Sequence, residues 1–464
     1  MKHWLVLLSA TLLASGCTVG PNYKRPIVAV PSSYRGMVPE QNAQTQAAPL
    51  GDQKWWDIFR DEQLRALIRT ALAQNYDLRI AGSRVLEAQA QLGIIRADQF
   101  PTLGAGAAID DTRAAQSKFL PAFETSSGQV SLSAAWELDF WGKFRRATEA
   151  ARANLLATEW ARQEVVSTLV ANVAGAYFQL RALDLQLEIS KRTLDSRQES
   201  LRLTRVLSNG GATSLLDVRQ AEQLVFTASA EVPALEQQIE QQENFLNILL
   251  GQNPGDIARG QTLTEQRQPP EVPPGLPSSL LERRPDIREA EAQLIAANAE
   301  IGVARAAYFP QISLSGSGGF QSSALTNLFS GPAGAWSFGA SLAQPIFTGG
   351  RLRSQVRLTE AQQQTAALFY QQSIQEAFRG VSDALVAYRK TREFRVQQES
   401  LFQSAQDAAR LSHLRYAGGA TGYLEVLTNE TNAFSAELGL AQARLNELLA
   451  LVQLYEALGG GWQQ

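Results

Sequence analysis

The chain has 464 residues, 45% of them hydrophobic, so it can bury a substantial core and is long enough for two or three ordinary domains. Its formal net charge is -3, and its Lys and Arg residues are scattered among Glu, Asp and many Gln residues. This distribution excludes the basic face that a nucleic-acid-binding protein normally presents.

The first residues have the pattern of a secretory signal. In MKHWLVLLSATLLASGC a lysine precedes an apolar run from Leu5 to Leu13, and small residues lead to Cys17, the only cysteine of the chain. This order is typical of a bacterial lipoprotein signal. We expect a signal peptide at 1–16 and covalent lipid, palmitate included, on Cys17, where two or three acyl chains give stable membrane attachment. A plain signal peptide with an incidental cysteine is the alternative.

Two further observations concern the destination of the chain. Thr18, directly after the cysteine, is not an aspartate, which agrees with onward export to an outer membrane. No segment after the signal has the roughly 18 uninterrupted apolar residues of a membrane-spanning helix.

A helix is predicted near 64–99, and two strand-like segments follow it. TLGAGAAID from Thr102 alternates weakly with a period of two, whereas GQVSLSAAWELDF from Gly128 alternates clearly. In the second segment Val130, Leu132 and Trp136 face one way, and the intervening serines face the other. The two segments therefore predict strands with one apolar and one polar face.

A very long helix is predicted next, at about 143–208. No proline occurs between Pro121 and Pro233, and the apolar residues of this tract keep a helical spacing. About 66 residues at 1.5 Å each make a rod of roughly 100 Å. We expect two shorter helices, stacked end to end, to cover its apolar stripe as in coiled coils. A solvated charged rod is the alternative.

The turn GGATSLLDV begins at Gly210, and a helix is predicted after it at 215–250. Nearly the same nine residues, GGATGYLEV, begin at Gly418. We expect the glycine pairs Gly210 and Gly211, and Gly418 and Gly419, to accept left-handed conformations. Thr213 or Thr421 is expected to cap the returning helix.

The recurrence extends well beyond the turns, because RADQFP from Arg96 matches RAAYFP from Arg305. The second copy predicts a helix at 285–308, strands from Gln311 and Ala335, a rod at about 351–416 and a helix at 423–458. Two copies of this length indicate an internal two-fold repeat of a whole substructure, since solenoid repeats recur every 20 to 50 residues.

The four strand segments have the length of membrane strands. Each has about the 9 to 11 residues that a tilted strand needs to cross a bilayer, and aromatic residues gather towards the segment ends. A half-buried sheet in a soluble protein is the alternative. Four strands cannot close a barrel, and an open edge in lipid is costly. Two chains would give a filled eight-stranded barrel, whereas three give twelve strands and a polar lumen, so we predict a trimer.

These residues resemble TolC-like outer membrane efflux ducts, in the lipoprotein branch related to NodT. The resemblance rests on GCTVGPNYKRP at Gly16, KWWDIF at Lys54, LLERRPDI at Leu280, FPQISLSGSGGF at Phe309 and LGGGW at Leu458. It implies a mainly α fold with β structure: a homotrimer with a periplasmic α-barrel of long antiparallel helical hairpins and a 12-stranded transmembrane β-barrel, four strands per chain. An equatorial belt would include RQPPEVPPGLP from Arg267.

The expected organisation follows the repeat. It comprises a signal peptide at 1–16, a lipid-anchored N-terminal segment at 17–61, a first structural repeat at 62–250, a Pro-rich equatorial linker at 251–284, a second repeat at 285–458 and a tail at 459–464. The resemblance implies an exit duct of a tripartite efflux or export system. Anchored in the outer membrane and extending into the periplasm, it would passively conduct substrates received from a periplasmic adaptor and an inner-membrane pump.

The resemblance also implies roles at the hairpin tips, which close the duct at rest and receive the adaptor. The tip motif gripped by the adaptor would comprise Gly210, Gly211, Ala212, Gly418, Gly419 and Ala420. Asp217 and Tyr416 match a pair that links neighbouring hairpins in the closed state. Glu425 lies where some members place an acidic ring, and Leu424 where others place an apolar ring. Thr421 and Thr428 depart from the family, replacing an arginine and a second acid.

Each of these roles has a simpler alternative. Asp217 and Glu425 would serve as ordinary acids in the first turn of a helix, where the dipole favours them, and Tyr416 would pack against the turn. No pattern predicts an enzyme, a metal site or a cofactor other than the lipid. His413 is the one histidine after the signal, and a lone histidine cannot form a metal site.

Two other functions are alternatives to the exit duct. A periplasmic adaptor would have one helical hairpin between compact β domains, whereas this chain predicts two hairpins and no such domain. A structural envelope lipoprotein would need neither the alternating strands nor the repeated turn. The cargo and the partner pump are not named by any motif, and cargo selection belongs largely to the pump.

Overall fold

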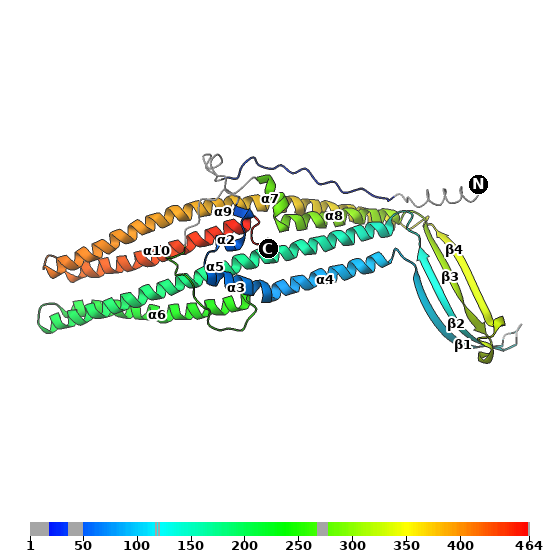
Figure 1. Cartoon of the computed structure of the whole chain (residues 1–464), viewed down its shortest axis with the longest axis horizontal. Helices are drawn as coiled ribbons and strands as arrows, with labels where there is room; N and C mark the ends of the chain where they lie inside the picture. The colour runs from blue at the N-terminus through cyan, green and yellow to red at the C-terminus, as the bar shows by residue number, and fades with distance from the viewer. Residues whose placement is uncertain (1–17, 36–49, 117, 119–120, 267–276, 463–464) are drawn as a thin grey trace. The chain divides into compact units, whose positions relative to one another are not determined.

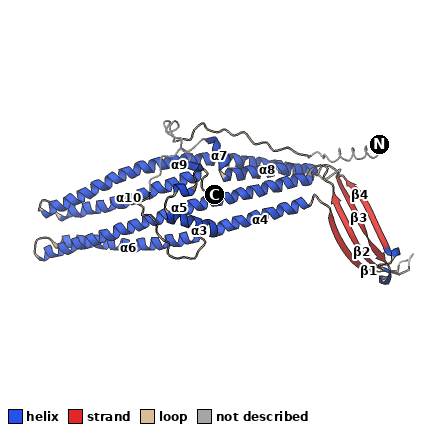
Figure 2. Ribbon diagram, in the orientation of Figure 1, coloured by secondary structure: helices blue, strands red, loops and turns tan. Residues whose placement is uncertain are grey.

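The computed structural model describes residues 18–35, 50–116, 118, 121–266 and 277–462. The chain divides into two compact units (Figure 1). Unit 1 contains the described residues of 1–27, 84–159 and 289–371, and unit 2 contains those of 28–83, 160–288 and 372–464. Unit 1 holds all four strands, and the described regular structure of unit 2 is helical (Figure 2).

The two predicted rods are present with nearly the predicted bounds. Helix α5 spans Lys143–Asn209 and helix α9 spans Arg351–Ala417, with 67 residues each. After the glycine turns, α6 (Leu215–Leu249) and α10 (Tyr423–Ala457) run back along them as two antiparallel hairpins (Figure 1). The repeat of the sequence is therefore a repeat of structure.

Helix α6 continues through Pro233 without a break. Proline lacks the N–H that would bond to the carbonyl four residues earlier, and its ring crowds that carbonyl, so it normally kinks or ends a helix. Here Ala228 and Leu235 on either side are buried. Their packing holds the segment helical, which agrees with the helix predicted across this position.

The helix predicted at 64–99 is two helices, α3 (Glu62–Gln74) and α4 (Tyr76–Ala97). Asn75 separates them with a non-helical ψ of 133°. Its side chain donates to the carbonyl of Leu249 at 3.0 Å and accepts from the N–H of Leu78 at 3.0 Å. The break therefore serves the C-terminal end of α6. Helix α7 (Pro277–Arg283), which falls within the predicted linker at 251–284, precedes α8 (Pro285–Ala306), the first helix of the second repeat. The short α2 (Trp55–Ile58) lies before α3.

The sheet is antiparallel with the strand order β1-β2-β3-β4. Its strands are β1 (Thr102–Ala114), β2 (Phe123–Glu137), β3 (Gln311–Ser322) and β4 (Gly334–Ala343). The β2–β3 pairing joins the two repeats. β1 and β2, with 13 and 15 residues, are longer than predicted. Among the described residues, no helix is long and apolar enough to cross a membrane.

Small residues let helices approach closely in unit 1. Ala150 and Ala153 of α5 are buried against Ala296 and Ala299 of α8. The core of unit 2 has larger side chains, and its fully buried members include Tyr177, Leu180, Leu246, Leu280, Ile374 and Leu445. The close approach expected from the Ala-rich rods is thus present in unit 1.

Candidate functional site

The first hairpin tip is closed by a Schellman motif. The N–H of Ala212 donates to the carbonyl of Leu207 at 2.9 Å, and the N–H of Gly211 donates to that of Ser208 at 3.0 Å. Gly211 has a φ of +75°, which a glycine adopts without strain. Gly210 keeps a negative φ. Of the glycine pair expected to accept left-handed conformations, only Gly211 adopts one, because the motif needs a single such residue.

The returning helix α6 is capped by Ser214 rather than by Thr213. The Ser214 hydroxyl accepts from the N–H of Asp217 at 3.2 Å, and the Asp217 carboxylate accepts from the N–H of Ser214 at 2.9 Å. This reciprocal pair is a capping box. Thr213 lies one residue too early to reach the free N–H groups, and its hydroxyl donates to the Asp217 carboxylate instead.

Asp217 is thereby committed to its own helix. Hydrogen bonds from the Thr213 hydroxyl and then from the Ser214 N–H hold the pKa of Asp217 below its ordinary value. The carboxylate is ionised at neutral pH. Within one chain it takes the role of a first-turn acid, and its predicted link to a neighbouring hairpin stays a prediction.

The second tip has the same turn but a weaker cap. Gly419 has a φ of +70°, Gly418 does not have a positive φ, and the N–H of Ala420 donates to the carbonyl of Arg415 at 2.9 Å. The N-cap of α10 is Gly422, which has no side chain to accept a hydrogen bond. The expected Thr421 cap is wrong, because its hydroxyl donates to the Glu425 carboxylate.

The predicted constriction residues project from the start of α10. Leu424 is 62% exposed. Glu425 faces Arg415 of α9 with 3.8 Å between carboxylate oxygen and guanidinium nitrogen. The six predicted tip residues are also exposed: Gly210, Gly211, Ala212, Gly418, Gly419 and Ala420. Both sets are available for contacts outside the chain.

Tyr416 joins the two hairpins of one chain near their tips. Its ring lies 5.3 Å from the ring of Tyr423. It also packs on a buried cluster from three helices: Leu201 of α5, Val218 and Ala221 of α6, and Tyr423, Val426 and Leu427 of α10. The structure thus brings Tyr416 into the tip region, as a packing residue between the hairpins.

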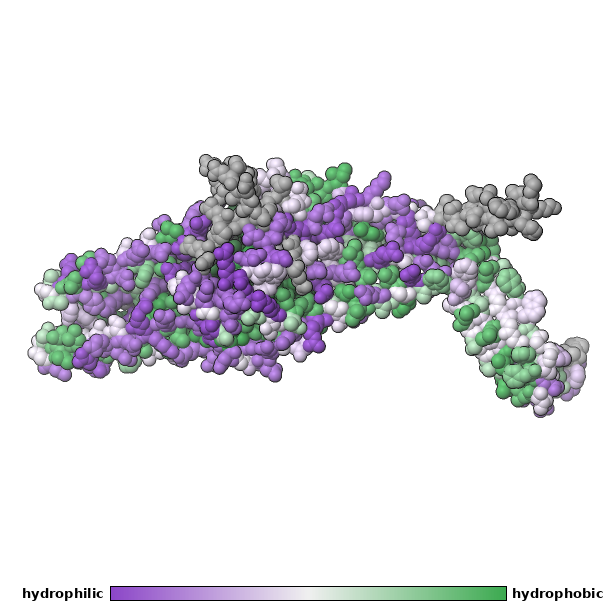
Figure 3. Space-filling model, in the orientation of Figure 1, coloured by the Kyte–Doolittle hydropathy of each residue, from purple (hydrophilic) through white to green (hydrophobic). Residues whose placement is uncertain are grey.

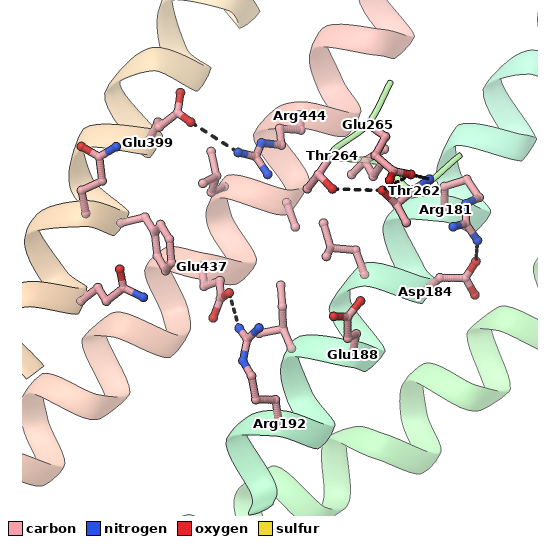
Figure 4. A pocket seen from close by; sticks show the side chains of 18 residues that line it. Arg181, Asp184, Glu188, Arg192, Thr262, Thr264, Glu265, Glu399, Glu437 and Arg444 are labelled. Carbon is pink, nitrogen blue, oxygen red and sulfur yellow. Dashed lines mark hydrogen bonds and ion pairs between the residues drawn. The ribbon is translucent and has the colours of Figure 1, made fainter. Parts of the chain in front are cut away.

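A cavity of about 700 Å³ lies between α5, α9 and α10 (Figure 4). Ion pairs cross or border it: Arg192 of α5 pairs with Glu437 of α10, and Arg444 of α10 lies 3.4 Å from Glu399 of α9. Leu263 and Thr264 line its edge. These residues were not predicted from the sequence, since pairing between hairpins leaves no local signal in a helix rich in charged residues.

The non-repeat residues 257–266, here called the cross-hairpin segment, bridge both hairpins. The Ile257 N–H donates to Glu243 of α6 at 3.0 Å, and Arg181 of α5 donates to the Gln261 carbonyl at 3.0 Å. Leu263, 3% exposed, and Thr264 lie beside Arg395 and Glu447 of the second hairpin. This segment belongs to the predicted equatorial linker, whose Pro-rich part at 267–276 lies outside the described residues.

The N-terminal segment after the predicted lipid site is docked within unit 1. The Val19 N–H donates to the carbonyl of Trp141 at 3.0 Å, and Arg146 donates to Asn22 at 2.7 Å. Arg25 pairs with Glu291 at 2.5 Å. Cys17 itself lies outside the described residues, so its acylation stays a prediction.

The sheet has one apolar and one polar face. Direct cross-strand partners share a face, and the register aligns Leu103, Ala134 and Gly316 in one row and Ala105, Leu132, Gly318 and Trp336 in another. The next rows combine serine and glycine. The visible side of the sheet in Figure 3 is mainly white to green. The alternation read from the sequence therefore becomes two chemically distinct surfaces.

Aromatic pairs mark both ends of the sheet. Trp141 stacks on Phe309 with 4.7 Å between ring centroids, next to the starts of α5 and β3. At the hairpin end, Phe320 lies edge-on to Phe329 at 5.7 Å. Two aromatic levels are typical of strands that cross a bilayer.

The family profile described as "Outer membrane efflux protein" matches residues 67–252 and 276–460. The chain belongs to this family. A relative is the probable efflux pump outer membrane protein TtgC of Pseudomonas putida, 38% identical over 100% of this chain and 96% of the relative. The cation efflux system protein CusC of Escherichia coli is 35% identical over 99% of both chains.

Solved channels of this family have the same fold. The open state of the Neisseria gonorrhoeae MtrE outer membrane channel superimposes with a TM-score of 0.88 at 33% identity, over 96% of this chain and 99% of that chain. A CusC structure gives 0.87 at 34% identity, over 96% and 100%. The predicted fold is thereby confirmed: a trimer with an α-barrel of helical hairpins and a 12-stranded transmembrane β-barrel. The chain is an outer membrane efflux channel, which confirms its predicted function and outer membrane location.

Proposed function

We propose that three copies form a passive exit duct that receives its cargo from a periplasmic adaptor and an inner-membrane pump. The observation that supports this most is that one chain has both two exposed glycine tips and a membrane sheet with one apolar and one polar face. Both rods, α5 and α9, begin after strands and end at tips. A periplasmic adaptor with one hairpin, and a structural lipoprotein, do not require this combination.

The six tips of the trimer are the proposed entrance, gate and adaptor site. Their glycines, with Ala212 and Ala420, are small enough for a partner helix to approach the backbone closely. Leu424 and Glu425 are the proposed constriction. Tyr416 and Asp217 are the proposed closing contacts between hairpins.

The duct is proposed to act without catalysis and without choosing its cargo. Relatives that are 35–38% identical are named as efflux proteins for antibiotics, toluene and cations. Such variety among full-length relatives supports a common conduit whose cargo is selected by the pump. Opening would then follow from partners that bind the open state better than the closed one.

Cys17 is the proposed lipid attachment site. The contacts of residues 18–25 support it. They hold the chain directly after Cys17 against unit 1, so a lipid on Cys17 would be attached at a defined place on that unit. Mass spectrometry of the N-terminal peptide tests the proposal. The expected result is a diacyl or triacyl mass on the wild type, and its absence in Cys17→Ala. An unmodified, signal-cleaved N-terminus in the wild type would contradict it.

Single-channel recording in a planar bilayer tests the duct and its gate. We expect small, mostly closed currents from the wild type and longer openings from the Asp217→Ala, Tyr416→Phe double variant. Ser214→Ala is the matched control, because it removes the cap hydroxyl and leaves the Asp217 carboxylate. Equal opening in this control would assign the effect to fraying of α6. No current from any variant, with trimers shown to be inserted, would reject the duct.

A further inference from the structure

The polar face of the sheet is lined by small, uncharged side chains. The register places Gly104, Ser133, Ser317 and Ser337 in one row across four strands, and Thr102, Ala135, Ser315 and Gly339 in the next. The hydroxyls of Ser317 and Ser337 are 2.8 Å apart, and those of Ser313 and Ser341 are 2.7 Å apart. These serine hydroxyls therefore hydrogen-bond to one another within the sheet.

This polar face is the lining of the pore. The opposite face carries Leu103, Leu132, Trp336, Phe338 and Leu342, all exposed in one chain. In a transmembrane barrel the apolar face contacts lipid and the alternate residues face the lumen. The serine and glycine rows consequently face the conducted solute.

Two acidic residues lie on this lining within the described strands, Asp110 and Glu137. Glu137, at the helix end of β2, pairs with Lys143 at 3.0 Å. Asp110, near the hairpin end of β1, forms no ion pair with any residue that the structure describes. Its cross-strand partner is Ser127. The charges of Asp111, Arg113 and Glu124 belong to the opposite face, where Arg113 and Glu124 pair at 3.3 Å.

We infer that Asp110 sets the charge preference of the outer mouth of the pore. β1 leaves the helices at Thr102 and reaches the β1–β2 hairpin beyond Asp110, which places this residue away from the periplasmic helices. In the trimer three carboxylates surround the lumen at this level. Against a neutral wall they attract cations and repel anions within about a Debye length. Asp110 is thus a specificity-determining residue distinct from the hairpin tips.

The test places a reporter thiol beside Asp110. Ser127→Cys puts the thiol on the same face, directly opposite Asp110 in the register. Charged methanethiosulfonate reagents of opposite sign are added to the outer side of cells or proteoliposomes, and their rates of modification are compared. Because the reagents enter from the outer side, the measured modification rates do not depend on whether the periplasmic tips are open or closed. The chain without the reporter gives the background.

Three comparisons decide the outcome. We expect the ratio of cationic to anionic rates at Ser127→Cys to fall about threefold when Asp110→Asn is added. Adding Asp111→Asn, the matched control on the opposite face, should leave the ratio unchanged. An unchanged ratio with Asp110→Asn, or an equal fall with Asp111→Asn, would overturn the inference. A thiol at 127 that is inert in assembled trimers would also overturn it, because the polar face would then not line an open lumen.

Discussion

At the scale of single residues, Asp61 shows how the cross-hairpin segment is held. This carboxylate is 1% exposed and accepts from the Tyr177 hydroxyl at 2.9 Å and from the Gln261 N–H at 2.9 Å. The Tyr177 hydroxyl in turn accepts from the Gly260 N–H at 2.9 Å. Burial, followed by the hydrogen bond to Asp61, raises the pKa of Tyr177, so the hydroxyl stays protonated across physiological pH.

Tyr177→Phe should destabilise unit 2. The change leaves the buried Asp61 carboxylate with one donor fewer and the Gly260 N–H without its acceptor, which costs about 1–3 kcal/mol. The measurement is the denaturant midpoint of the detergent-solubilised trimer. Tyr308→Phe, at a tyrosine 43% exposed, is the control and should leave the midpoint unchanged. A midpoint equal to the wild type in Tyr177→Phe would show that water replaces the hydroxyl without loss.

The cap of the first tip should weaken in acid. The pKa of Asp217 is depressed, so its carboxylate contributes stability above the ordinary value of about 3.9 and loses it as pH falls through the depressed pKa. We expect the amide protection factors of residues 214–218 to fall below about pH 4. Asp217→Asn, which cannot ionise, should show a smaller dependence. Identical pH profiles for the two proteins would refute this role.

At the scale of elements, the two hairpins differ although their turn sequences match. α6 begins with a capping box at Ser214, whereas α10 begins at Gly422 without a side-chain cap. Removing a serine cap costs about 1 kcal/mol, and glycine is weaker than serine by a few tenths. The second tip is therefore the one that frays more readily.

Gly422→Ser should strengthen the second tip, because Glu425 already stands three residues later as in a capping box. We expect protection factors at the start of α10 to rise about twofold, and those at the start of α6 to fall about fivefold in Ser214→Ala. Hydrogen exchange read by mass spectrometry measures both. If Gly422→Ser slows the exchange of no amide at the start of α10, the prediction is wrong, and the Glu425 carboxylate is already taken up by the Thr421 hydroxyl.

Elements with a strong period were predictable, and contacts between elements were not. The bounds of α5 and α9 follow from proline-free tracts with helical spacing, and the faces of β2 follow from its alternation. Asn75 was missed because the apolar pattern continues across it. What breaks the helix there is a hydrogen bond to Leu249, far along the chain.

The tip residues illustrate the same limit at the candidate site. The GGAT motif indicated a turn, but the sequence did not show whether Thr213 or Ser214 caps the next helix. Both residue types are common N-caps, and the choice depends on the exact residue at which the helix begins. Arg192 and Glu437 meet because two hairpins lie side by side, which no local pattern contains. Asp110 was part of a recognised strand, and its place on the lining needed the register of all four strands.

At the scale of the whole molecule, barrel closure depends on keeping the two sheet faces distinct. Leu132→Arg puts a charge on the lipid face, where Leu132 is 68% exposed in the single chain, at a cost of about 2–4 kcal/mol at mid-membrane. We expect loss of recovered trimer. Ser133→Arg, the next residue on the opposite face, should assemble and lower the conductance. Normal trimer yield for Leu132→Arg would contradict the assigned faces.

The difference between Ser214 and Gly422 has a consequence for assembly. In the proposed duct, three chains place six tips around one entrance, three beginning with a capped helix and three with an uncapped one. The proposed entrance therefore has three-fold rather than six-fold symmetry. Six identical partner subunits docked there would occupy two environments in alternation, and their binding should saturate in two steps of three.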